Sequence, residues 1–186
     1  GISVSFYATD GVTPFFNIPI EMTEGTSVFS ADEKFIFDQK RIEFFSEWKP
    51  KVFIIAAKWS IRNIEQTEDL IQFIGKLGSQ IILLEQPPEL FFGDKNTPQF
   101  LSYTNIFPQE TTKKYLPVAV GKKAKKYLDG CKLVQEISEK HSYCNLVHIK
   151  DLYFDKGKAL VLDGKDVLYI DDDHLSHSGA IKARNR

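Results

Sequence analysis

Two short, continuous apolar runs separated by one amphipathic segment constrain the fold more than any other feature of this sequence. The runs cover residues 51–57 and 79–84. Between them, residues 65–77 carry apolar side chains at helical spacing, and Gly78 ends the pattern. A strand, a helix and a strand with short connections predict a parallel sheet with right-handed crossovers. Such strands are expected to be buried on both faces.

The same alternation continues on both sides of this unit. Ser30 and Glu33 fit a capping box, which predicts the start of a long helix with Phe35 and Trp48 on its apolar face. A second long helix is expected over residues 121–140, and a last core strand follows over residues 144–149. We therefore predict one α/β domain with a mainly parallel sheet over the whole chain.

Three other segments are expected to form less regular structure. Residues 2–8 alternate between apolar and polar side chains, as in a strand. Residues 91–117 show no clear period, and they indicate an irregular insertion over the carboxyl edge of the sheet. Residues 159–162 and 167–170 flank Asp163-Gly164, which predicts a hairpin.

Composition excludes some partners and leaves other properties open. The net charge of −1 indicates no polyanion-binding surface, so nucleic acid is not expected as a partner. No run approaches the roughly 20 apolar residues of a membrane span. Cys131 and Cys144 are compatible with a disulfide or with two buried thiols. Nothing in the sequence indicates a cofactor.

A run of three carboxylates directly before a histidine is the pattern in the chain that most clearly indicates catalytic chemistry. Asp171, Asp172 and Asp173 precede His174 on a turn after a strand-like segment. The i, i+3 spacing of Asp171 and His174 can bring both side chains to one side. A carboxylate beside an imidazole fixes its tautomer and stabilises its protonated form, which suits a general base. Ser176 is expected to cap the last helix.

Two other interpretations of this pattern are open. One is an acidic turn with a surface histidine and a helix cap. The other is a divalent metal site formed by the three aspartates together with His174 and His177. Adjacent aspartates point in different directions, so no metal site is predicted.

The string Tyr-x-Asp-x-x-His-Leu-Ser-x-x-Gly-Ala, which spans residues 169–180, resembles the final block of SGNH hydrolases. More narrowly, it resembles the extracytoplasmic SGNH domain attached to acyltransferase-3 membrane proteins, which O-acylate cell-surface glycans. The resemblance implies a three-layer α/β/α sandwich with a flavodoxin-like sheet. It also implies a serine nucleophile, His174 as the general base and Asp171 as the acid that orients it.

The same resemblance implies partners and a location. The partners are an acyl donor, a glycan acceptor such as lipopolysaccharide or peptidoglycan, and a transmembrane acyltransferase domain in the parent protein. The domain is then expected outside the membrane, in the periplasm or at the cell surface. A non-catalytic carbohydrate-binding or interaction domain that has kept the fold is the alternative.

The chain departs from the family pattern at the nucleophile. It has no Gly-Asp-Ser block, and Ser60 and Ser102 are candidates by residue type only. Gly1-Ile2-Ser3 resembles the region after the first strand and first helix. We therefore expect that the first strand and the nucleophile, about 30 residues on the scale of a βα unit, are missing. Whether this chain is itself an active enzyme stays open.

Two further residues are candidates for oxyanion or substrate binding. Gly11, in a turn-rich loop after the first strand-like segment, could offer a backbone N–H to an oxyanion, or it is simply a turn glycine. The family's Gly-x-Asn is absent after residues 51–57, where Lys58-Trp59-Ser60 stands instead. Trp59 could stack on a sugar face, or it could pack half-buried against the domain.

Overall fold

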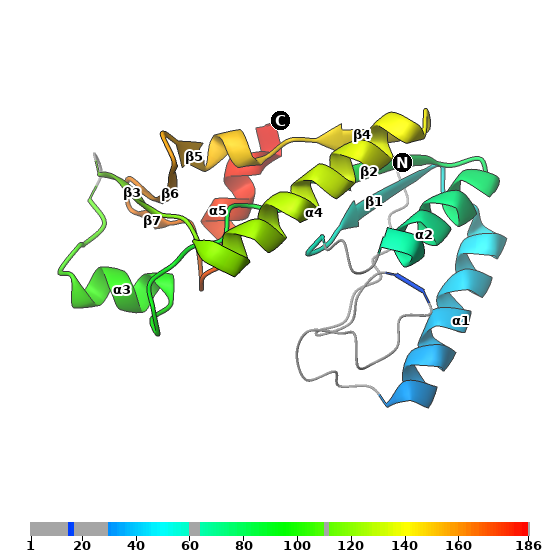
Figure 1. Cartoon of the computed structure of the whole chain (residues 1–186), viewed down its shortest axis with the longest axis horizontal. Coiled ribbons are helices and arrows are strands. Elements are labelled where there is room, and N and C mark those ends of the chain that lie inside the picture. The colour runs from blue at the N-terminus through cyan, green and yellow to red at the C-terminus, as the bar shows by residue number, and fades with distance from the viewer. Residues whose placement is uncertain (1–14, 17–29, 60–63, 110–111, 186) are drawn as a thin grey trace.

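The computed structural model describes residues 15–16, 30–59, 64–109 and 112–185. Its first sheet contains β1 (Val52–Ala56), β2 (Gln80–Leu84) and β4 (Cys144–Val147), in the order β1-β2-β4 (Figure 1). Both pairings are parallel, as the two apolar runs predict. The predicted strand over residues 2–8 lies outside the described residues.

Three helices accompany this sheet in a three-layer α/β/α arrangement: α1 (Ala31–Trp48), α2 (Ile64–Lys76) and α4 (Gly121–Lys140). The predicted capping box is confirmed at the start of α1. The Ser30 hydroxyl accepts from the Glu33 backbone N–H, and the Glu33 carboxylate accepts from the Ser30 N–H. Among the described helices, none combines the length and the apolar character that a membrane crossing requires.

A second, antiparallel sheet was not predicted. It contains β3 (Lys113–Pro117), β6 (Lys158–Asp163) and β5 (Phe154–Asp155), with β7 (Asp166–Val167) also paired to β6. The predicted hairpin around Asp163-Gly164 is confirmed as the pairing of β6 with β7. The short helices α5 (His177–Lys182), η3 (Lys150–Leu152) and η4 (Ala183–Asn185) complete this half.

The expectation of an irregular insertion over residues 91–117 is wrong in part. The segment contains α3 (Thr97–Tyr103) as well as β3. The Asn96 side chain accepts from the Gln99 N–H, and the Gln99 side chain accepts from the Asn96 N–H, with Pro98 in the first turn. A capping box followed by proline is a sequence signal for the start of a helix. The irregular spacing of the aromatic residues drew attention away from it.

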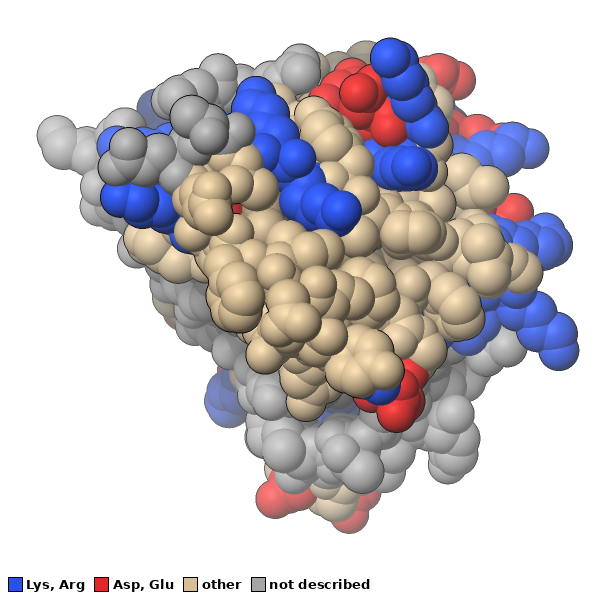
Figure 2. All heavy atoms as spheres, turned by 90° about the vertical axis from the view of Figure 1, so that its left-hand side faces the viewer, with Lys and Arg blue, Asp and Glu red and all other residues tan. Residues whose placement is uncertain are grey.

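The side of the molecule that carries α3 and β3 is poor in charge. Figure 2 shows a broad area there without Lys, Arg, Asp or Glu, with lysine and arginine side chains at its border. Exposed aromatic residues on and beside α3 include Phe91, Tyr103 and Phe107. These three side chains therefore do not pack into the core, whereas Phe92 and Phe100 stack on each other there.

The hydrophobic core has two parts, one for each sheet. The first lies around the parallel sheet and includes Ile71, Ile81, Leu83 and Val134. The second lies around the antiparallel sheet and includes Tyr153, Leu162 and Tyr169. Cys131 and Cys144 are both free thiols, and burial raises the pKa of each to about 11.

Two expectations about burial are wrong. β1 is buried on one face only: Phe53 and Ile55 are buried, whereas Ile54 on the other face is 66% exposed. In α1, Phe35 is 59% exposed, whereas Lys34, Asp38 and Arg41 are buried. Asp38 pairs with both cations, and each cation also contacts the segment at residues 15–16. A buried charge needs such partners, so the inner face of α1 is ionic where an apolar stripe was expected.

The backbone of α4 touches the exit of β1 at Gly130. A Cβ atom at this position would lie 2.3 Å from the Trp59 carbonyl oxygen and 2.9 Å from its carbon. Backbone atoms cannot give way as a flexible side chain can. The contact therefore places the segment after β1, which carries Lys58 and Trp59, against α4.

We predict that Gly130→Ala lowers the free energy of unfolding by roughly 1–3 kcal/mol, as overpacking does, although alanine favours helix. Urea unfolding followed by circular dichroism measures the change. Gly75→Ala is the matched control in α2, because its Cβ would meet only the movable Tyr143 ring, at 2.5 Å. The free energy of unfolding should fall clearly less in Gly75→Ala than in Gly130→Ala. Equal stabilities for Gly130→Ala and the unmodified protein would contradict the close contact.

Candidate active site

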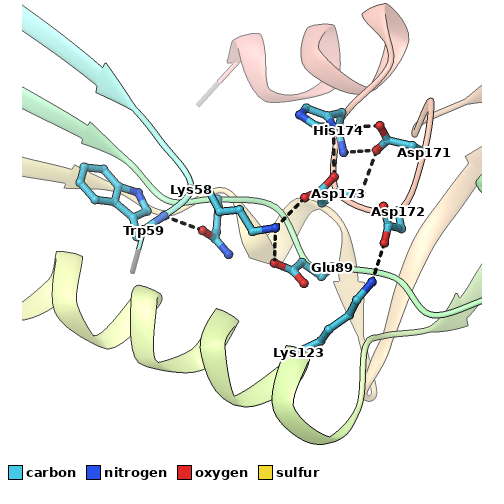
Figure 3. Close-up of polar contacts among 9 residues, drawn as sticks. Lys58, Trp59, Glu89, Lys123, Asp171, Asp172, Asp173 and His174 are labelled. Atoms are coloured by element: carbon cyan, nitrogen blue, oxygen red, sulfur yellow. Dashed lines mark hydrogen bonds and ion pairs between the residues drawn. The ribbon is translucent and has the colours of Figure 1, made fainter. Parts of the chain in front are cut away.

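The turn that carries Asp171 to His174 lies beside the segments that follow β1 and β2 (Figure 3). Lys58, just after β1, donates to Asp173 over 2.9 Å and lies 3.4 Å from Glu89, in the segment after β2. In parallel α/β sheets this carboxyl-end edge is where ligands bind. The turn belongs to the antiparallel half of the protein, and it meets the parallel sheet at this edge.

Backbone hydrogen bonds fix the conformation of the turn. Tyr169 and Leu175 form an antiparallel bridge, and the Ile170 N–H donates to the His174 carbonyl over 3.0 Å. Two neighbouring segments also donate to the turn. The Leu90 N–H donates to the Asp172 carbonyl over 2.7 Å, and the Thr97 hydroxyl donates to the Asp171 carbonyl over 2.6 Å.

Helix α5 anchors the turn from its other end. Ser176 caps this helix as predicted, because its hydroxyl accepts from the Gly179 N–H over 3.0 Å. The same hydroxyl donates to the Val167 carbonyl over 2.5 Å. Gly179 packs so closely that an added Cβ would lie 2.1 Å from the Leu168 carbonyl oxygen. The position of His174 is therefore set by contacts on both sides of it in the chain.

The Asp171 carboxylate accepts three hydrogen bonds. One oxygen accepts from the backbone N–H of Asp173 at 3.0 Å and from that of His174 at 2.7 Å, and the other lies 2.8 Å from His174 Nδ1. A carboxylate is an acceptor only, so Nδ1 carries the proton. In the neutral ring Nε2 is then an acceptor, and it has no partner among the described residues. This is the tautomer that a general base requires.

The local charges favour ionised forms of both groups. Partial burial would raise the pKa of the Asp171 carboxyl, but the N–H groups of Asp173 and His174 outweigh it and hold that pKa below its ordinary value. Partial burial would lower the pKa of the His174 imidazole. The hydrogen bond with Asp171 and the charges of Asp173 and Asp171 outweigh it, so that pKa lies above its ordinary value.

Asp171, Asp173 and His174 could each offer one ligand atom to a metal ion, and these atoms lie within 4.8 Å of one another. The imidazole Nδ1, however, faces both carboxylates, and the second oxygen of Asp173 accepts from Lys58. An ion would have to displace a proton and an ammonium group. The contacts fit an ion-paired histidine better than a metal centre.

Of the other predicted site residues, Gly11 and Ser60 lie outside the described part of the chain. Ser102 is exposed on α3, and no serine hydroxyl in the described part of the chain is hydrogen-bonded to the His174 ring. Trp59 is only 2% exposed, and its indole N–H donates to the Leu84 carbonyl over 2.7 Å. A ring with no free face does not fit the predicted role in sugar stacking.

Sequence reasoning missed Lys58 and Glu89. Lys58 directly follows a predicted buried strand, which places it at the carboxyl edge where functional groups gather. That position was a usable signal. Its partner Asp173 is 115 residues away, and nothing in the sequence indicates this pairing.

The sequence model of the family described as SGNH domain (fused to AT3 domains) matches residues 1–186. The chain belongs to this family. Searches of curated proteins and of solved structures gave no match. Membership of the SGNH family supports acyl-related hydrolase or transferase chemistry, and its fusion to acyltransferase-3 domains implies a transmembrane partner domain.

We predict that Asp171→Asn lowers the pKa of the His174 imidazole by roughly 1 unit, because the carboxylate that stabilises the cation is lost. The asparagine oxygen can still accept from the two backbone N–H groups, so the turn should persist. NMR titration of the histidine ring resonances measures the change. Asp172→Asn is the matched control, because its carboxylate pairs with Lys123. A larger shift for Asp172→Asn would contradict the assigned pairing.

Removal of divalent ions should leave the protein unchanged. We predict the same melting temperature with and without excess EDTA, because the histidine and carboxylates already satisfy one another. Differential scanning calorimetry provides the measurement. A fall in melting temperature that returns on addition of Zn²⁺, Mn²⁺ or Mg²⁺ would show that the acidic turn holds a metal.

Proposed function

We propose that this SGNH domain carries out Ser-His-Asp acyl-ester chemistry and transfers an O-acyl group, acetyl in the simplest case, to a cell-surface glycan such as lipopolysaccharide or peptidoglycan. It would act outside the membrane as part of a membrane acyltransferase. One observation carries the proposal: an imidazole held through Nδ1 by a carboxylate, with Nε2 left without a partner among the described residues. Membership of a family fused to acyltransferase-3 domains supports transfer in preference to simple hydrolysis.

The proposed reaction has two halves. A serine oxygen attacks the acyl carbonyl of the donor, and its proton passes to His174 Nε2. The tetrahedral intermediate collapses, the leaving group takes that proton, and an acyl-serine remains. A glycan hydroxyl then attacks the acyl-serine and gives its proton to Nε2, and the serine recovers the proton as the new ester leaves. Asp171 stabilises the imidazolium in both halves.

The nucleophile and the oxyanion donors are assigned by this proposal to residues beyond those described. The serine lies outside residues 15–16, 30–59, 64–109 and 112–185, and its oxygen reaches Nε2 from the open side of the ring. Gly11 supplies a backbone N–H to the oxyanion. The His174 side chain is 70% exposed in the described part, which leaves room for a nucleophile and an acyl donor to approach.

We predict that a fluorophosphonate probe labels one serine of the full-length protein and that His174→Ala abolishes the labelling. General-base catalysis contributes roughly 10²–10⁴-fold, so esterase activity on p-nitrophenyl acetate should fall by that factor. Mass spectrometry of the labelled peptide identifies the nucleophile.

His148→Ala is the control, because its ring pairs with Glu85 and not with the Asp171–His174 turn, so the change should not affect labelling. Labelling and turnover that survive His174→Ala would overturn the proposal. Glycan binding without labelling or turnover in the unmodified protein would instead support the non-catalytic carbohydrate-binding domain.

A further inference from the structure

Two carboxylates compete for one ring nitrogen in this site. His174 Nδ1 lies 2.8 Å from Asp171 and 3.0 Å from Asp173. Nδ1 carries one proton, so it can make one good hydrogen bond at a time. A ring shared evenly between two acids would have no fixed orientation. Something must therefore distinguish the two carboxylates.

The two acids differ in what else they bind. The backbone N–H groups of the turn hold Asp171 in place. Asp173 is instead held through its other oxygen by the Lys58 ammonium, at 2.9 Å. Figure 3 shows Lys58 reaching from the exit of β1 to Asp173 and Glu89, with His174 and Asp171 on the far side of Asp173.

Lys58 is itself well fixed. Its ammonium lies 3.4 Å from Glu89, whose side chain is only 7% exposed. The backbone of the next residue, Trp59, is in close contact with Gly130 of α4, which fixes the start of the Lys58 side chain. Burial would lower the pKa of Lys58, but Asp173 and Glu89 outweigh it and raise that pKa above its ordinary value. The ammonium is therefore charged at every pH at which the histidine titrates.

We propose that Lys58 is a positioning residue that holds Asp173 and thereby leaves Asp171 as the orienting acid of His174. This inference rests on the proposed role of His174 as a general base. Without Lys58, the charge of Asp173 is uncompensated next to the ring. Both carboxylates then stabilise the imidazolium, and less of the neutral base is present at a given pH.

The charged groups around the imidazole come from the turn and from the segments after β1 and β2. Asp171 and Asp173 of the turn contact the ring itself, and Lys58 and Glu89, from the segments after the two strands, lie behind Asp173. Lys123, at the start of α4, pairs with Asp172 at 2.8 Å and is as exposed as Lys58. Lys123 thus carries the same charge at the same edge, but it is not paired with a carboxylate that contacts the imidazole.

The test is an NMR titration of the His174 ring with labelled histidine, which requires no catalytic activity. We expect Lys58→Met to raise the pKa of His174 by roughly 0.5–1 unit. Lys123→Met should raise it by less than half as much. Lys58→Gln provides a second variant if the methionine variant folds poorly, and Lys58→Arg should restore most of the original pKa.

A double-mutant cycle separates action through Asp173 from direct repulsion between Lys58 and the ring. In the Asp173→Asn background, Lys58→Met should shift the pKa of His174 by less than half of its effect in the unmodified protein. Equal shifts for Lys58→Met and Lys123→Met, or an unchanged Lys58 effect after Asp173→Asn, would overturn the inference. If the domain proves to have no acyl chemistry, the titration still decides this point.

In the active full-length protein, kcat/KM rises with pH as His174 loses its proton. The midpoint of this rise should move to higher pH with Lys58→Met and stay near its original pH with Lys123→Met. A loss of stability without a shift of this midpoint would show that Lys58 is only a structural ion pair.

Discussion

One carboxylate, that of Asp171, accepts two backbone N–H groups and the Nδ1–H of His174, and the candidate site depends on these three bonds. The backbone bonds close the turn, and the third fixes the ring's tautomer. Because one side chain does both, closure of the turn places the carboxylate beside the His174 ring. A base positioned in this way loses little freedom when a substrate arrives, which is the advantage of a preorganised site.

The turn lies where two differently built halves of the protein meet. Its backbone belongs to the antiparallel half, through the Tyr169–Leu175 bridge and the anchoring bonds from Leu90 and Thr97. Its charged side chains are held from the parallel half, by Lys58 after β1 and Lys123 on α4. Surface ion pairs of this kind contribute little to stability. Of the two, only the Lys58 pair involves a carboxylate that contacts the His174 ring, which is why the proposed electrostatic role is given to Lys58.

Local patterns predicted the parallel sheet, its helices, the Ser30 and Ser176 caps and the β6–β7 hairpin, because hydrophobic period and capping chemistry act over a few residues. The pairing of β3 with β6 joins segments far apart in the chain, and no local pattern encodes it. The ionic inner face of α1 was missed because charged residues are usually exposed. Asp171 and His174 were found because their contact is local, whereas Lys58 reaches Asp173 only through the tertiary fold.

The most direct test of this account is a structure of the full-length protein with a phosphonate inhibitor covalently bound to its nucleophilic serine. The account predicts that the oxygen of this serine lies within about 3 Å of His174 Nε2, while Nδ1 remains on Asp171. An adduct on a serine next to a different histidine, or a His174 ring turned away from Asp171, would contradict it.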